Sequence, residues 1–284
     1  MNKKKNNSSR HTFPSVSMFK TRPSYKEVEK PPKNRFLSFV LLGSVIFFLF
    51  SLWQLNLEYS RLWSGTGELI KFISNMFPPD LSNWEKIMLA ALESLQIALV
   101  GTVFGILLSL FLAFLAAENI TPHLSISYGI KSMAAFVRAI PALVWALIFI
   151  VAVGMGPFPG ILALAFNSIG MLVKVFAQSI EELDDGVLEA MKSTGANWLH
   201  MVFQGIIPSV LTALIAWCVF RFEINFRYAT ILGMVGAGGI GWELTSAMRV
   251  YRLQEAIFII FLIFFMVFAA EMLGNRVKKL VKSN

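Results

Sequence analysis

Apolar runs of about 20 residues recur along the chain, and they constrain its fold more than any other feature, because an α-helix of that length crosses a lipid bilayer. The runs cover residues 36–53, 89–117, 132–153, 161–177, 206–228 and 256–273. Charged residues make up only 15% of the chain, whereas a soluble domain of this size carries roughly a quarter. We therefore predict an all-α membrane protein with about six transmembrane helices.

The distribution of Lys and Arg predicts how these spans are oriented. If the amino terminus lies inside, sixteen of the 25 Lys and Arg residues fall in inner segments, five in outer segments and four within spans. Inner segments of membrane proteins are enriched in Lys and Arg. The sequence therefore predicts a multi-pass protein of the cytoplasmic membrane with both termini in the cytoplasm.

The chain divides into four parts by composition. Residues 1–35 form a basic arm, which we expect to be cytoplasmic and mostly disordered. The first span and an outer segment occupy 36–75, the remaining spans occupy 76–275 with a polar loop at 178–205, and 276–284 is a basic cytoplasmic tail. A basic arm can bind nucleic acid, but a span follows this one at once, so membrane orientation is the simpler explanation. We expect membrane lipid, and no nucleic acid, around this chain.

The polar loop carries signals for a short helix. The Asp-Asp-Gly sequence at 184–186 favours a helix start, 187–191 supplies an apolar face, and Gly195 would end the helix. A second amphipathic piece, 198–203, leads to Pro208 at the beginning of the next span. A short helix on the cytoplasmic surface is suited to fit a groove in a partner protein. The alternative is an ordinary interhelical loop that caps itself.

Several charged residues fall inside predicted spans, where each costs a few kcal/mol unless it is paired or faces water. Arg138 lies in the third span, and Arg221, Glu223 and Arg227 lie in the fifth. Glu223 and Arg227 are four residues apart and can pair on one helix face. Arg221 lacks that partner, although Asn225 shares its face. An unpaired cation in a polar pathway would attract an anion; the alternatives are a structural contact between helices or a dimer contact.

A glycine-rich stretch, VGAGGIG at 235–241, follows the fifth span. It does not lie between a strand and a helix, so it is not a dinucleotide-binding loop. Glycine at positive φ suits a re-entrant backbone that lines a cavity. Close helix packing is the alternative. The glycines concerned are Gly236, Gly238, Gly239 and Gly241.

The sequence contains no recognisable catalytic or metal-binding set. The Lys-Ser-Thr at 192–194 lacks the glycines that precede it in a phosphate-binding loop, so we expect no ATP hydrolysis by this chain. Cys218 is the only cysteine and lies in an apolar run, and the three histidines are scattered. We therefore expect no cofactor and no metal in this chain.

Four residues of the polar loop match, in identity and spacing, the Glu-Ala-Ala, Gly and Ile-x-Leu-Pro pattern of permeases from ABC importers: Glu189, Ala190, Gly195 and Pro208. Three positions depart from that pattern. Met191 replaces the second Ala, Gly205 replaces the Ile, and Ile207 replaces the Leu.

Other stretches resemble the same permeases, most of all those of the phosphonate-import subfamily. They are RAIP at 138–141, FRFEINFR at 220–227, VGAGGIG at 235–241, FPPDLSNW at 77–84 and VGMGPFPGILALAF at 153–166. The resemblance covers residues 76–275.

The resemblance implies the type I ABC importer permease fold, of the MetI-like kind, in the cytoplasmic (inner) membrane of a bacterium. It implies a permease subunit, not an enzyme, that carries phosphonate or a related oxyanion. Its implied partners are a cytoplasmic ATPase dimer that binds ATP-Mg, an extracytoplasmic solute-binding protein and a second permease copy. The residues implied to couple the permease to the ATPase are Glu189, Ala190, Met191, Gly195 and Pro208. Those expected at the pathway or its gate are Arg138, Pro141, Arg221, Glu223, Asn225, Arg227, Gly236, Gly238, Gly239 and Gly241.

Two other functions stay open on the sequence. The same kind of importer could carry phosphate, phosphite or methionine, and methionine-type permeases share the RAIP and polar-loop elements. A secondary transporter driven by an ion gradient, with Glu223 as a proton relay, would transport without any ATPase.

Overall fold

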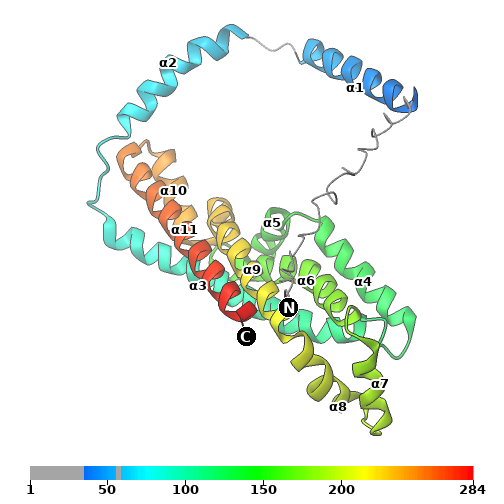
Figure 1. Cartoon of the computed structure of the whole chain (residues 1–284). Coiled ribbons are helices and arrows are strands. Elements are labelled where there is room, and N and C mark those ends of the chain that lie inside the picture. Colours follow the sequence, from blue (N-terminus) through cyan, green and yellow to red (C-terminus); the bar gives the residue numbers. More distant parts are fainter. Residues whose placement is uncertain (1–34, 56–58, 284) are drawn as a thin grey trace, which may run out of the picture. The chain divides into compact units, whose positions relative to one another are not determined.

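A computed structural model describes residues 35–55 and 59–283, and helices joined by turns and loops make up that part of the chain. The predicted basic arm, 1–35, lies outside the described residues except for Arg35. The chain separates into two units, Met1–Ser64 and Gly65–Asn284. The first contains α1 (Arg35–Gln54) and the start of α2 (Tyr59–Asn75). The second contains all later helices (Figure 1).

The helix α1 has the length and composition of a membrane span, as predicted. It is apolar on every side and has no buried residue within the described structure. A helix that is hydrophobic all round needs an apolar surrounding on all sides, which lipid supplies. The amphipathic α2 lies in the part of 36–75 that the sequence predicted only as an outer segment.

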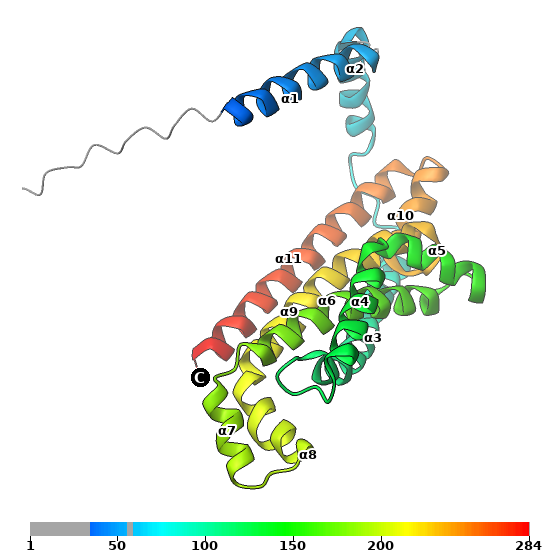
Figure 2. The same cartoon turned by 90° about the vertical axis from the view of Figure 1, so that its right-hand side faces the viewer.

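In the second unit, α3 (Trp84–Ala116), α6 (Pro157–Glu181), α9 (Ile207–Leu232) and α11 (Leu253–Ser283) run alongside one another (Figures 1 and 2). The helices α3 and α6 approach closely at two glycines of α3. A Cβ atom on Gly105 would lie 2.4 Å from the Cβ of Ser168, and one on Gly101 would lie 2.9 Å from the Cβ of Leu164. Small residues four apart permit this approach of two helices in a membrane.

The third predicted span, 132–153, is not one straight helix. The structure places α4 at Leu124–Ala139 and α5 at Ala142–Val153, with a bend of 87° between them. The break falls at Pro141, which has no backbone N–H and forces an extended conformation on Ile140, whose ψ is 122°. The described part of the chain holds 5 helices that could cross a membrane, or up to 6 if this bent pair is one span.

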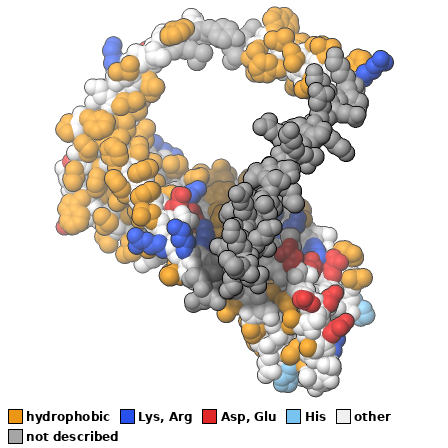
Figure 3. All heavy atoms as spheres, in the orientation of Figure 1, with side chains coloured by type: hydrophobic (Ala, Val, Ile, Leu, Met, Phe, Trp, Pro, Cys, Tyr) orange, Lys and Arg blue, Asp and Glu red, His pale blue; other side chains and the backbone are white. Residues whose placement is uncertain are grey.

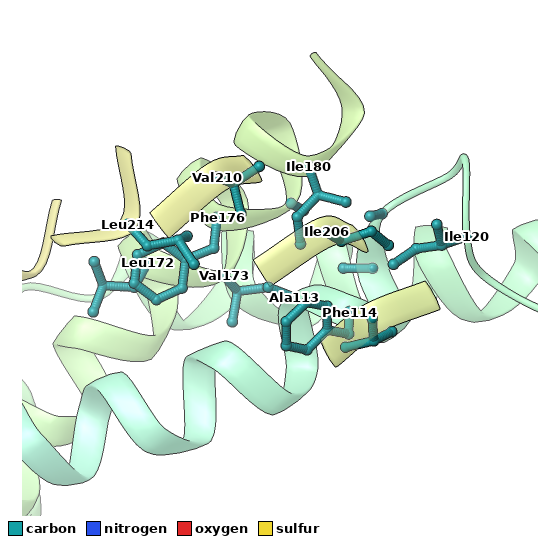
Figure 4. Close-up of a cluster of buried hydrophobic side chains, with 14 of the residues drawn as sticks. Ala113, Phe114, Ile120, Leu172, Val173, Phe176, Ile180, Ile206, Val210 and Leu214 are labelled. Atoms are coloured by element: carbon teal, nitrogen blue, oxygen red, sulfur yellow. The ribbon is translucent and has the colours of Figure 1, made fainter. Parts of the chain in front are cut away.

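A buried apolar cluster joins α3, α6 and the beginning of α9. Figure 4 shows Phe114 of α3 and Phe176 of α6 in the same cluster as Ile206 and Leu214. Phe176 and Ile206 are fully buried. Within a bilayer, such contacts hold helices together by van der Waals packing, because lipid is as apolar as the side chains.

The two ends of the second unit differ. One end carries α7 (Asp185–Ser193), α8 (Trp198–His200) and the π-helix η1 (Met201–Ile206). The other end carries the π-helix η2 (Gly233–Ala237) and α10 (Gly239–Arg249), as Figure 2 shows. In Figure 3, acidic side chains gather around the end with α7, whereas hydrophobic side chains cover the α10 and α11 side.

Candidate functional site

The helix α7 begins and ends where the sequence predicted. The Asp184 side chain accepts a hydrogen bond of 2.8 Å from the Gly186 amide, which caps the helix. At the other end, Gly195 has φ of 74° and its amide donates to the carbonyl of Lys192 at 3.0 Å. Glycine adopts this left-handed conformation at little cost, so it ends the helix.

One side of α7 is buried and the other is exposed. Leu188 belongs to the apolar cluster and is 5% exposed. Glu189 and Ala190 lie on the exposed side, whereas Met191 is half-buried. An open hollow of about 460 Å³ beside the helix is lined by Asp184, Gly186, Val187, Ala190 and Met191. The helix therefore presents a carboxylate and a hollow to any partner at this end.

Several contacts join the segment from Met191 to Pro208 to the spans. Met191 packs on Gly205 in η1, where an added Cβ would lie 3.1 Å from the Met191 Cγ. The Trp198 indole donates to the carbonyl of Ile120 at 3.1 Å, in the turn between α3 and α4. Pro208 lies in the first turn of α9. The predicted second amphipathic piece continues through η1 into α9 without a break at Pro208, because α8, η1 and α9 follow one another directly from Trp198 to Leu232.

The turn after α3 is also tied to the end of α6. Lys131 bridges Glu118 at 2.7 Å and Glu181 at 2.8 Å. The Asn119 side chain donates to the carbonyl of Ile180 at 2.9 Å. These contacts fasten α3, α4 and α6 together next to α7.

The charged residues of α9 lie on two different faces. Arg221 is 3% exposed, and its Nε donates to the Ser168 hydroxyl at 2.9 Å. Asn225 is fully buried and donates to Ser168 and to Thr102, each at 2.8 Å. The predicted shared face of Arg221 and Asn225 is thus confirmed, and it faces α3 and α6. The Nη2 atom of Arg221 is buried without a hydrogen-bond partner among the described residues.

Glu223 and Arg227 lie on the side of α9 that faces α11. They pair at 3.5 Å, as their spacing predicted. Lys278 of α11 lies closer to Glu223, at 2.9 Å, and Glu271 lies 3.1 Å from Arg227. Glu223 itself is 8% exposed. Two carboxylates and two cations therefore join α9 to α11.

Arg138 and Pro141 lie at the bend between α4 and α5. Arg138 is exposed in the last turn of α4, and Pro141 precedes α5. Beside them is a pocket of about 650 Å³, which we call the α4–α6 pocket. It is lined by Lys131, Ala135, Arg138, Ala139, Gly170, Lys174, Gln178 and Glu181.

The glycine-rich stretch combines positive φ values with close packing, and its predicted place at a cavity stays a prediction. Gly236, Gly238 and Gly239 have φ values of 114°, 79° and 70°, so the backbone turns sharply between α9 and α10. The packing is also close. The Ser94 hydroxyl of α3 accepts a hydrogen bond of 2.9 Å from the Ile240 amide, and Gly241 lies against the backbone of α9.

Sequence reasoning missed several partners of these residues. Thr102, Glu271 and Lys278 carried no signal of their role, because each lies on a different helix from the residue it contacts and far from it in sequence. The described residues contain no group of three or more His, Cys, Asp or Glu side chains placed to hold a metal ion.

Comparisons with known sequences point to one kind of protein. The family model described as "binding-protein-dependent transport system inner membrane component" matches residues 105–283. The chain is 37% identical over 231 residues to the phosphate-import permease protein PhnE of Mycolicibacterium smegmatis. The matched part is 81% of this chain but only 43% of that relative. It is 35% identical to the putative phosphite transport system permease protein HtxC of Stutzerimonas stutzeri, over 80% of each protein.

Solved structures share the fold. A chain of the inward-facing MetNI methionine ABC transporter matches with a TM-score of 0.60 at 18% identity, over 69% of this chain and 95% of that one. A chain of an amino acid ABC transporter with histidines matches with a TM-score of 0.58 at 20% identity, over 70% of this chain and 96% of that one. The predicted all-helical, MetI-like permease fold is thereby confirmed.

Proposed function

Since the chain belongs to the family of binding-protein-dependent transport system inner membrane components, we propose that it is the permease of an ABC importer for phosphonate, phosphite or phosphate. The single observation that carries the choice of cargo is its identity of 35% and 37% to permeases named for phosphite and phosphate, along about four-fifths of its length. Phosphonate, the cargo of the subfamily that its motifs resemble, has the same tetrahedral phosphorus oxyanion chemistry.

The permease moves cargo by changing conformation, with the energy supplied elsewhere. A cytoplasmic ATPase dimer binds ATP-Mg and pushes on Glu189–Gly195 when it closes. Leu188 and Met191 transmit that push through Gly205 to α9, because they pack against the cluster and against η1. ATP thereby shifts the population between two packings of the spans. This chain supplies the coupling surface and the pathway.

The proposal includes two further partners. A solute-binding protein delivers cargo at the end of α10, where Asp80, Tyr251 and Arg252 line an open pocket of about 460 Å³. The hydroxyl and amide of Ser82 donate to Asp80 and lower its pKa below the usual value, so this carboxylate stays charged to a lower pH than an ordinary aspartate. A second copy of the permease completes the pathway, as a homodimer.

The proposed pathway runs past the charges and glycines named above. Arg138, exposed at the bend before Pro141, is accessible to cargo. A pathway role for Arg221 has another support. Its guanidinium is buried, and no carboxylate lies beside it among the described residues. The glycines at 236–241 form the gate at the outer end. Glu223, Asn225 and Arg227 hold the spans that flank the pathway.

An ion-gradient mechanism has less support. Its proton relay would be Glu223, but this carboxylate lies between Lys278 and Arg227. Its ion pairs with these two cations, one of them on α11, suit a structural contact between two spans.

Proteoliposomes that contain the permease, its ATPase and the binding protein test the function. We expect ATP-dependent uptake of phosphate, phosphite or methylphosphonate. In Glu189→Lys, uptake per ATP hydrolysed should fall about tenfold, which corresponds to a loss of roughly 1.4 kcal/mol in the free energy of coupling. Glu68→Lys, with the same charge change at an exposed site on α2, should transport normally. Uptake that proceeds without ATPase or ATP would refute the importer.

A further inference from the structure

Two helix faces meet at the α4–α6 pocket. Its lining residues on α4 lie at 131, 135, 138 and 139, and those on α6 lie at 170, 174, 178 and 181. Apart from the adjacent residues 138 and 139, intervals of three or four residues place each set on one side of its helix. The pocket is therefore built along two spans of the same chain.

Small side chains leave space for a ligand in the pocket, and one glycine allows α4 and α6 to approach each other closely. Ala135 and Ala139 line the α4 side. Gly170 brings α6 so close to α4 that a Cβ on it would lie 2.8 Å from the backbone nitrogen of Arg138. This contact holds the backbone of Arg138 at the wall of the pocket.

The charges of the pocket do not balance. Lys131 pairs with two carboxylates, Glu118 and Glu181, which outweigh its charge by one, so that Arg138 and Lys174 leave the group with a net charge of +1. Within residues 35–55 and 59–283, the side chains of Arg138 and Lys174 make no hydrogen bond and no ion pair. A cation within a membrane-spanning segment costs a few kcal/mol unless an anion or water compensates it.

We propose that the α4–α6 pocket binds a tetrahedral phosphorus oxyanion, held by Arg138 and Lys174. The planar guanidinium of Arg138 donates two parallel hydrogen bonds to two oxygens of such an anion. The ammonium of Lys174 adds a point charge from the facing helix. A pocket of about 650 Å³ leaves room for the anion and part of its hydration shell.

This oxyanion has two sources, the cargo and the headgroup of an anionic phospholipid. The cargo source rests on the proposed function, because only an importer of such anions brings them to this pathway. The phospholipid source rests on the membrane alone, since basic pockets between spans bind phosphate headgroups.

The first arm of the test measures free anion. The full-length permease is placed in nanodiscs of phosphatidylcholine alone, and the ³¹P NMR line width of inorganic phosphate, phosphite and methylphosphonate is followed. We expect broadening of at least one anion, with a dissociation constant that rises at least about tenfold in Arg138→Gln/Lys174→Gln. Lys174→Arg should bind as the wild type does. Lys279→Gln removes an exposed cation of α11 and is the matched control.

The second arm measures lipid. The permease is extracted from native membranes in mild detergent, and native mass spectrometry counts retained anionic phospholipid. Retention by the wild type and loss from the double variant would assign the pocket to a headgroup. Size-exclusion chromatography checks that each variant is folded. A structural role of Arg138 at the carboxyl end of α4 would lower stability without changing the binding of either anion.

If the double variant matches the wild type in both arms, the proposal is refuted. The outcome for the importer is separate, because neither arm needs the ATPase. Intact ATP-driven uptake with no binding in the pocket would reject only the pocket. Binding in the pocket without ATP-driven uptake would reject only the importer.

Discussion

Gly241 lies where α10 passes the end of α9, and it has no room for a side chain. An added Cβ would fall 1.9 Å from the carbonyl oxygen of Thr230 and 2.9 Å from the amide of Met234. Both atoms belong to the backbone, so no rotamer change relieves the contact. This position shows why a glycine-rich stretch here is needed for packing as well as for its unusual φ values.

We expect Gly241→Ala to lower the stability of the permease by about 1–3 kcal/mol, as overpacking usually does. Gly129→Ala is the control, because Gly129 lies within α4 and has nothing within 4 Å of its added Cβ. That change should raise stability by roughly 0.5–1 kcal/mol, since alanine favours a helix. Thermal unfolding in detergent measures both. Equal midpoints for Gly241→Ala and wild type would contradict this account.

At the scale of elements, the two larger departures from the permease pattern touch each other. Met191 stands in the position of an Ala and Gly205 in the position of an Ile, and the added Cβ of Gly205 would lie 3.1, 3.6 and 3.7 Å from three atoms of Met191. A large side chain on α7 thus fills the space that a small residue leaves in η1. The contact between α7 and η1 is kept although the large and the small residue have exchanged places.

This exchange predicts a rescue. Gly205→Ile alone should overfill the contact and cost about 1–3 kcal/mol, whereas Met191→Ala alone should leave a void. The double variant should recover at least about 1 kcal/mol relative to the sum of the single effects, as contacting residues do. Thermal unfolding and uptake per ATP are the measurements.

Met191→Ala combined with Gly129→Ala is the matched control for that cycle. These two changes should be additive, because Gly129 lies on another helix with no neighbour near its added Cβ. Additive effects in the Met191 and Gly205 pair would show that the two residues do not compensate each other.

At the scale of the whole molecule, the charge distribution predicts one orientation in the membrane. The turn after α3 contacts the end of α6 and Trp198, and α11 ends on the same side as α7 in Figure 2. Within the second unit, the turn after α3, the polar loop and the carboxyl-terminal tail, all of which the Lys and Arg distribution assigns to the cytoplasm, therefore lie at one end. Their side of the membrane is a prediction of the positive-inside rule.

Labelling of single cysteines tests that orientation. Cys218, the only native cysteine, is replaced by Ser, and either Leu81→Cys or Ser193→Cys is introduced at an exposed site. A membrane-impermeant maleimide should label Leu81→Cys in spheroplasts and Ser193→Cys only in inside-out vesicles. The reverse pattern would place α7 outside and would exclude a cytoplasmic ATPase as its partner.

Much of the secondary structure follows from local properties of the chain. A span needs only enough consecutive apolar residues, because lipid offers no hydrogen bonds and the backbone must satisfy its own. The bounds of α7 likewise follow from Asp184 and Gly195, whose effects act within a turn of their own positions. The same holds for the pairing of Glu223 with Arg227 on one helix face.

Other features depend on which helices are neighbours, and only the tertiary structure decided them. Pro141 is a residue that interrupts a helix, but the packing of α4 and α5 on the bundle sets the angle of 87° between these two helices. The charges of α9 and the glycines of 235–241 were evident as residues, whereas their partners come from α3, α6 and α11. Helix periodicity relates residues within one element, and side-chain contacts between elements depend on how those elements pack. Lys174 and Arg138, distant in sequence, line one pocket for that reason.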